Sequence, residues 1–236
     1  MSALRAVVFD WGGTLTPYHE VDLLDLWRVA ARVLAPDREH EMGDALAAAE
    51  REWWRRADDG GHESGTTDDV LALACARTGI DAQPVLREQA LAAHLEAWSE
   101  HTACEPDARP TLEALRARGL RTALLSNTHW PREWHERWLE RDGILDLLDV
   151  RVYTSDLGHT KPHAEAFGAA LGALGVEPGE AVMVGDRPRD DIAGAKAAGM
   201  RAVLRPNPFV PAGPVEPDAV IRSLPELLRV VEAWSV

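Results

Sequence analysis

Short apolar runs that alternate with helical segments constrain this fold more than any other feature of the sequence. Each run is bounded by turn residues, which is typical of buried strands. The first run covers residues 5–9, and after residue 104 further runs lie near 121–125, 149–153, 181–185, 201–204 and 219–221. Alternation of strands with helices predicts an α/β fold with a doubly wound, parallel, Rossmann-like sheet.

Residues 17–104 interrupt this alternation and are helical in pattern throughout. We expect a smaller all-helical domain there, with Thr67 as a helix N-cap before two acidic residues and with 58–65 as a turn-rich linker. The expected helices span 22–34, 39–58, 67–78 and 84–100. The chain is therefore divided into an α/β core domain, residues 1–16 and 105–236, and a helical domain, residues 17–104.

Composition limits the classes of partner and compartment. The chain has 236 residues, of which 46% are hydrophobic, enough for one core and a smaller domain. A net charge of −14 disfavours nucleic acid as a partner. Cys75 and Cys104 are too few for a disulfide framework, so we expect a reducing, cytoplasmic location. No leader or membrane span is expected, and a homodimer is compatible with the sequence.

The first apolar run ends in a carboxylate followed by a glycine-rich turn. Asp10 precedes Trp11-Gly12-Gly13-Thr14, and a carboxylate at the tip of a buried strand is a candidate nucleophile. The glycines let the backbone approach a ligand closely, and the next turn presents N–H groups to an anion. A carboxylate beside phosphate also needs a cation. The alternative is an aspartate that only caps a turn.

Three later segments complete a pattern of four motifs. They are 124–127, Leu-Leu-Ser-Asn; 158–162, Gly-His-Thr-Lys-Pro; and 182–191, which contains Gly185-Asp186 and Asp190-Asp191. In this order and spacing the four motifs resemble those of the haloacid-dehalogenase-like hydrolase superfamily, and the inserted helices resemble its helical cap. Taken singly, each segment could also be an ordinary helix cap or helix start.

The resemblance implies a role for each motif residue. Asp10 would attack phosphorus, Ser126 and Lys161 would hold the transferring group, and Asp186 with Asp191 would organise Mg²⁺. The implied substrate-binding residues also include Gly13, Thr14 and Asn127, and the implied metal site includes the backbone carbonyl of Gly12. Phosphoryl transfer depends mainly on positioning and on stabilisation of negative charge, which fits a lysine, a hydroxyl donor and a hard, oxygen-ligated cation.

One position departs from the family pattern. Phosphatases of this superfamily carry a second aspartate, the general acid and base, where this chain has Gly12. Because positioned acid–base catalysis contributes on the order of 10²–10⁴-fold, we expect slow turnover of alkyl phosphate monoesters. Glycine would be tolerated if the substrate needs no strong acid there, or if the substrate or the insert brings a proton donor. The donor candidates nearest in sequence are His19, Glu20, His62 and Glu63.

Phosphonate cleavage and dehalogenation would also be compatible with glycine at this position. Similar Asp-Trp-small-Gly-Thr segments occur in phosphonoacetaldehyde hydrolases, but that chemistry needs a Schiff-base lysine from the insert. The only lysines are Lys161 and Lys196, so we disfavour it. Dehalogenases of the superfamily also lack the acid–base aspartate. They have no need for a divalent metal, however, whereas Gly185-Asp186 with Asp190 and Asp191 fits the metal-binding form of the fourth motif.

Two further segments invite interpretation. Trp130, Trp134 and Trp138 recur every four residues, and one helix would stack them along a side, as a core face or as an aromatic wall for substrate or partner. His129 could reach the mouth of the active site. The proline-rich segment 205–214 is interpreted as structural.

These observations predict a Mg²⁺-dependent hydrolase with a mobile helical cap. It would act on a small phosphorylated metabolite through an aspartyl-phosphate intermediate. The alternative is a catalytically weak phosphate-ligand-binding or regulatory protein that keeps the metal and phosphate pocket.

Overall fold

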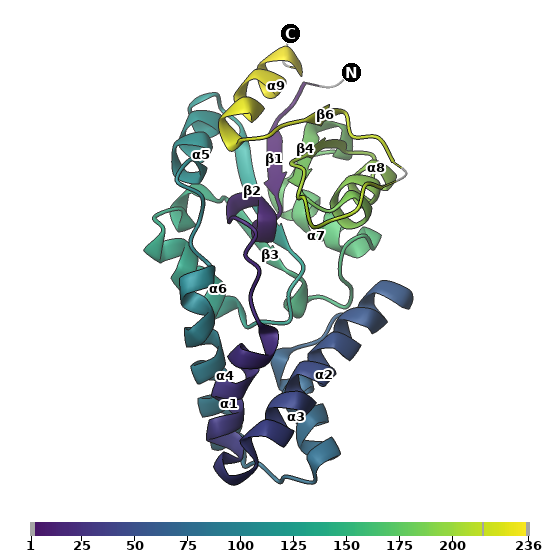
Figure 1. Ribbon diagram of the computed structural model, residues 1–236. Helices are drawn as coiled ribbons and strands as arrows, with labels where there is room; N and C mark the ends of the chain where they lie inside the picture. Colours follow the sequence, from purple (N-terminus) through teal and green to yellow (C-terminus); the bar gives the residue numbers. More distant parts are fainter. Residues whose placement is uncertain (1–2, 214, 235–236) are drawn as a thin grey trace.

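The computed structural model describes residues 3–213 and 215–234, and its centre is a parallel sheet of six strands in the order β3-β2-β1-β4-β5-β6 (Figure 1). All five strand pairings are parallel. The strands are β1 (Ala6–Phe9), β2 (Arg121–Ser126), β3 (Val150–Tyr153), β4 (Ala181–Gly185), β5 (Arg201–Leu204) and β6 (Ala219–Val220). The predicted strands and fold class are confirmed.

Alternate residues of β1 enter two different cores, as the two-residue period of a strand requires. Val7 and Phe9 pack in one core with side chains of the helices on one face of the sheet. Ala6 and Val8 pack in a second core with side chains of the helices on the other face. The first face is covered by α5 (Ala108–Ala117), α6 (Arg132–Arg141) and α9 (Leu227–Trp234), and the second by α7 (Ala164–Leu174) and α8 (Gly194–Ala197).

Four helices form a separate layer beyond the carboxyl ends of the strands (Figure 1). They are α1 (Leu23–Leu34), α2 (Glu39–Asp59), α3 (Thr67–Thr78) and α4 (Pro84–Trp98), and we call residues 17–104 the helical insert. The insert has its own apolar core, which includes Trp27, Leu46 and Leu71. The predicted helices are therefore present, except that α4 ends at Trp98 and a 3-10 turn, Ser99–His101, follows it.

The predicted cap of α3 is wrong by one residue. Thr66 is the N-cap: its hydroxyl accepts from the N–H of Asp69, and the Asp69 carboxylate accepts from the N–H of Thr66. Thr67 is the first helical residue, and its hydroxyl instead contacts His129 of the core domain. A reciprocal capping box therefore fixes the start of this helix and leaves Thr67 free to join the two parts of the molecule.

Strand order places the end of β1 at a special position. The chain lays β2 and β3 on one side of β1 and β4 to β6 on the other, so the order reverses at β1. Ligands of open α/β sheets bind at such a switch point, outside the carboxyl ends of the strands. Among the described residues, no helix is both long and apolar enough to cross a membrane.

Candidate active site

Asp10 lies at this switch point and contacts a buried lysine. Its backbone N–H donates to the carbonyl of Val184 at 2.9 Å, which ties the residue to β4. The Lys161 Nζ donates to Asp10 Oδ1 and to Asp191 Oδ1, each at 2.7 Å. The side chain of Lys161 is only 1% exposed. The structure thus brings three of the predicted site residues into one buried cluster, with an ammonium between two carboxylates.

Asp186 completes a group of three carboxylates. Ligand atoms of Asp10, Asp186 and Asp191 all lie within 4.8 Å of one another, and all three residues are buried. Asp186 Oδ2 accepts from the Asn207 side-chain amide at 2.8 Å, whereas Asp186 Oδ1 is buried without a hydrogen-bond partner among the described residues. A side chain at Gly13, which has φ +79°, would collide with Asp186 Oδ2.

The charges of this cluster do not balance. Three buried carboxylates face one ammonium, and the unpaired oxygen of Asp186 needs a positive partner. Burial, partly opposed by Lys161 and reinforced by the other two carboxylates, raises the pKa of Asp10 from 3.8 to about 7. Burial and the charge of Asp191 also raise the pKa of Asp186. An all-oxygen donor set with excess negative charge suits a hard divalent cation such as Mg²⁺.

Ser126 and Asn127 lie where β2 ends, and both line the cavity described below. The Asn127 side-chain amide donates to the Lys161 carbonyl at 3.0 Å, and the Lys161 N–H donates to Asn127 Oδ1 at 2.8 Å. Asn127 therefore holds the backbone of the lysine from the neighbouring strand end. Gly13 also lines the cavity, whereas Thr14 is fully buried and is not among the lining residues.

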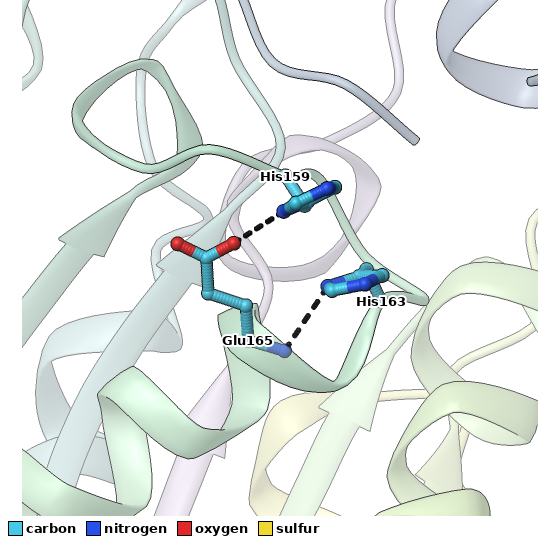
Figure 2. Close-up of side chains that lie close together, drawn as sticks. All are labelled: His159, His163 and Glu165. Carbon is cyan, nitrogen blue, oxygen red and sulfur yellow. Dashed lines mark hydrogen bonds and ion pairs between the residues drawn. The ribbon is translucent and has the colours of Figure 1, made fainter. Parts of the chain in front are cut away.

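The loop that carries Lys161 is braced by a second group of histidine and carboxylate side chains (Figure 2). His159 Nδ1 contacts Glu165 Oε2, and the rings of His159 and His163 stack with centroids 3.8 Å apart. His163 Nδ1 accepts from the N–H of Glu165 and caps α7, while the Gly158 N–H donates to Glu165 Oε1 at 3.2 Å. Because these ligand-type atoms are already engaged in capping and loop contacts, the group is best explained as a brace for the loop.

The helical insert docks on the same loop. The N–H of Thr160 donates to the carbonyl of His62 at 2.7 Å, and the N–H of Ser64 donates to the carbonyl of Gly158 at 2.9 Å. Glu63 and His159 form an isolated antiparallel bridge. His62 and Glu63, two of the expected proton-donor candidates, are thus loop-docking residues and do not line the cavity.

A cavity of about 540 Å³ lies between the carboxylate cluster and the insert. Its floor includes Asp10, Gly12, Ser126 and Lys161. The insert side is lined by Pro17, Tyr18, His19, Glu20, Val21, Leu23, Glu50, Trp54, Trp98, His101 and Thr102. Both remaining proton-donor candidates, His19 and Glu20, are therefore at the cavity, on its exposed side.

Gly12 opens onto this cavity and leaves its position empty. The residue is exposed, has φ −71° and ψ 120°, and a Cβ built on it meets no heavy atom of the described residues within 4 Å. Neither backbone strain nor crowding therefore demands glycine here. No side chain of the insert, which the structure describes in full, fills the vacated space.

Sequence reasoning missed a buried ion pair that joins the insert to the core. Glu50 of α2 accepts from the Trp27 indole at 2.6 Å, and its other oxygen lies 3.0 Å from His129 Nε2. The Thr67 hydroxyl donates to the His129 carbonyl, so it must accept from His129 Nδ1–H at 2.9 Å. One proton then remains for the contact between Glu50 and Nε2.

The environment of Glu50 favours its ionised form. Burial alone would raise the pKa of Glu50, but the hydrogen bond and charge of His129, with the Trp27 N–H, outweigh it and lower the pKa to about 2. Glu50 is consequently a carboxylate that accepts from the Trp27 indole and faces His129 Nε2. His129 was expected near the mouth and does line the cavity, but its nitrogens are committed to the insert.

The three evenly spaced tryptophans do not share one helix. Helix α6 begins at Arg132, so Trp130 precedes it and lines the cavity. Trp138 is buried in the core of the α/β domain, and Trp134 packs against that core. The core interpretation holds for the two helical tryptophans. Trp130 packs against the same core and also lines the cavity, so both interpretations apply to it.

Comparisons with known proteins agree with this geometry. The family model of the haloacid dehalogenase-like hydrolases matches residues 4–199. A glyceraldehyde 3-phosphate phosphatase of Methanopyrus kandleri is 31% identical over 85% of this chain and 83% of its own. For several other relatives, the match spans about half of their length.

Solved structures of two kinds resemble the whole chain. A HAD phosphatase from Thermococcus onnurineus has a TM-score of 0.68 and 29% identity, and covers 99% of this chain and 100% of its own. A 2-haloacid dehalogenase from Pseudomonas syringae has a TM-score of 0.72 and 27% identity, and covers 98% and 100%. The fold and the strand-end carboxylates define a hydrolase of the α/β class. More specifically, the chain belongs to the haloacid dehalogenase-like hydrolase family.

Proposed function

We propose that this hydrolase is a Mg²⁺-dependent phosphatase of small phosphorylated metabolites that uses Asp10 as its nucleophile. The observation that carries the proposal is the cluster of Asp10, Asp186 and Asp191 around Lys161 at the switch point of the sheet. Several relatives are named as phosphatases, among them the glyceraldehyde 3-phosphate phosphatase, which supports a small phosphorylated metabolite as the substrate. The excess of carboxylates supports a metal-dependent reaction.

The residues present fit the metal. Asp10, Asp186 and the backbone carbonyl of Gly12 would hold Mg²⁺, with Asp191 orienting Lys161 and contributing from further out. Bound there, Mg²⁺ would offset the repulsion between Asp10 and the phosphoryl oxygens.

The remaining steps belong to side chains of this chain. An oxygen of Asp10 attacks phosphorus, the bond from phosphorus to the leaving oxygen breaks, and the leaving group departs with the electron pair. Lys161 and Ser126 stabilise the charge on the phosphoryl oxygens. Water then attacks the phosphorus of the aspartyl-phosphate, which releases inorganic phosphate and regenerates the Asp10 carboxylate, and the proton of the water passes to solvent. Closure of the helical insert, as a cap domain, would exclude bulk water during the first step.

The competing chemistries fit the structure less well. Lys161 is buried between two carboxylates, and Lys196 contacts Asp218 at 2.6 Å, so neither lysine presents a free amine to the cavity for phosphonate cleavage. Dehalogenation needs no divalent metal, so it would not supply a cation for the unpaired oxygen of Asp186. A ligand-binding protein would use the same pocket without turnover, and only an activity measurement separates it from an enzyme.

The test is hydrolysis of acetyl phosphate and a panel of small phosphate monoesters with and without Mg²⁺. Asp10→Asn should reduce hydrolysis to background, because it removes the attacking charge at nearly constant volume. Asp186→Asn should lower Mg²⁺ affinity in calorimetry together with turnover. Asp146→Asn, at an exposed position outside the cavity, is the matched control and should behave as the wild type. Turnover by Asp10→Asn, or activity that survives removal of Mg²⁺, would contradict the proposal.

A further inference from the structure

The wall of the cavity is a continuous series of aromatic rings that starts beside the nucleophile. Trp11, next to Asp10, contacts Trp130 with ring centroids 6.2 Å apart, and Trp130 contacts Trp98 at 4.9 Å. The series continues from Trp98 to His101 at 6.0 Å and from His101 to His19 at 5.9 Å. All five residues line the cavity. A flat, apolar group attached to the phosphoryl oxygen would therefore lie against rings along its whole length.

Charge on the insert side of the cavity has one sign. The lining residues between Pro17 and Thr102, all within the described part of the chain, include Glu20 and Glu50 but neither lysine nor arginine. The lysine and arginine of the lining are Lys161, enclosed by carboxylates, and Arg187, one residue beyond Asp186 at the phosphoryl end. His129, also in the lining, lies 3.0 Å from Glu50. A leaving group with a carboxylate or second phosphate would meet no lysine or arginine among the lining residues of the insert.

The position of Gly12 adds a requirement on the leaving oxygen. Apart from its two chain neighbours, no described residue has a heavy atom within 4 Å of a Cβ built there, so no carboxylic acid stands at the position from which the family aspartate would protonate the leaving oxygen. An alkoxide would need that proton in the transition state, whereas a phenoxide carries its charge on an aromatic ring and leaves without one. The ring wall and the missing acid are independent features, and they favour the same kind of molecule.

We infer that the substrate is an aryl phosphate monoester, with an uncharged aromatic or heteroaromatic leaving group held against Trp98 and Trp130. This inference rests on the proposed phosphatase function and names its substrate class. In the reaction the bond from phosphorus to the aryl oxygen breaks, the electron pair leaves with the phenoxide, and the phenoxide takes a proton from solvent afterwards. Asp10 receives the phosphoryl group as before.

Four esters separate the two requirements in the presence of Mg²⁺. Phenyl phosphate has a ring and a stable leaving anion, benzyl phosphate has a ring and an alkoxide, propyl phosphate has neither, and 4-carboxyphenyl phosphate adds a negative charge. We expect kcat for phenyl phosphate to exceed that for benzyl phosphate by about 10²-fold. We also expect KM for benzyl phosphate to be roughly 5-fold below that for propyl phosphate. The carboxylate should raise KM relative to phenyl phosphate.

A tryptophan variant tests whether the aromatic wall causes the preference for aromatic esters. Trp98→Leu should lower the ratio of kcat/KM for phenyl phosphate to that for acetyl phosphate by about 5-fold. Trp234→Leu is the matched control, because Trp234 packs against the core of the α/β domain away from the cavity, and the ratio should not change. Calorimetry with Asp10→Asn gives a second readout without turnover: phenyl phosphate should bind more tightly than propyl phosphate.

Acetyl phosphate distinguishes failure of the aryl-phosphate inference from failure of the proposed phosphatase function. If acetyl phosphate is hydrolysed but propyl phosphate equals or exceeds the aromatic esters in kcat/KM, the aryl preference is overturned and the phosphatase function stands. If acetyl phosphate is not hydrolysed at all, the proposed function fails and the inference fails with it. An aromatic preference that Trp98→Leu leaves unchanged would also overturn the assignment of the wall.

Discussion

At the scale of single residues, Gly12 stands where the resemblance to phosphatases predicts a second aspartate. Its φ of −71° is open to any residue, and its empty surroundings leave room for a side chain. Neither strain nor crowding therefore accounts for glycine at this position, and its chemical effect is that residue 12 carries no acidic side chain.

Placing an acidic side chain at this position gives the first prediction. Gly12→Asp should raise the rate on alkyl phosphates such as benzyl phosphate by about 10-fold or more, a modest part of the usual acid–base contribution. The gain should be smaller for phenyl phosphate, which does not need the proton. Gly12→Asn has the same shape without the acid and should give no gain. Equal gains for both esters in steady-state assays would show that protonation is not the missing element.

Several of the site residues predicted from the sequence stand at strand ends. Asp10 and Ser126 stand at the carboxyl ends of β1 and β2, and a parallel sheet brings such ends together. Glu50 and Asn207 were missed because each acts through a partner far away in sequence. Glu50 looks like any polar residue of a long helix, and its contact with His129 joins residues 79 positions apart. Asn207 lies in a proline-rich segment whose composition predicts only a loop.

At the scale of elements, the pair of Glu50 and His129 fastens α2 to the loop after β2. Both side chains are buried, so removing one partner leaves the other without compensation. Glu52, two positions further along α2, forms ion pairs with Arg56 and Arg77 near solvent. Ion pairs at such positions contribute little to stability.

Glu50→Ala should therefore lower the free energy of unfolding by about 3 kcal/mol or more, since it leaves the buried His129 Nε2 and the Trp27 indole without their partner. Glu52→Ala, two positions along the same helix, should lower it by less than about 1 kcal/mol. Denaturant titrations of the two variants measure the difference. Equal losses would mean that the buried pair does not hold the insert to the core.

Two buried histidines should contribute to the pH dependence of the free energy of unfolding. Burial lowers the pKa of His94 from 6.5 to about 4 and that of His135 to about 3. Between these values and 6.5 the unfolded chain binds protons that the folded histidines do not, so the contribution of these two histidines to stability falls as pH falls from about 6.5 towards 4. Each histidine contributes on the order of 2–3 kcal/mol to this loss. Asp10, whose pKa is raised from 3.8 to about 7, contributes in the opposite direction over the same range.

Denaturant titrations across this pH range measure the effect. His135→Gln should flatten the dependence, whereas the exposed His40→Gln should leave it unchanged. A pH dependence that His135→Gln leaves the same as in the wild type would rule out a neutral, buried His135.

At the scale of the whole molecule, periodicity was sufficient to predict the sheet and the four inserted helices. The doubly wound order follows from the alternation of strand and helix, and the insert follows from its interruption. Side-chain details at the junction could not be predicted in the same way. Residues 62–64 dock on residues 158–160, and Trp130 lies before the start of α6. Both features depend on how the apolar cores of the insert and of the α/β domain meet.

The central claim is that Asp10 carries the phosphoryl group during turnover, and acid quenching followed by peptide mass spectrometry tests it most directly. Wild-type protein mixed with Mg²⁺ and phenyl phosphate or acetyl phosphate should show the added mass of one phosphoryl group on the peptide that contains Asp10. The modification should disappear without Mg²⁺ and in Asp10→Asn. Hydrolysis that proceeds with unmodified Asp10 at every quench time, or with the phosphoryl group on another residue, would contradict the account.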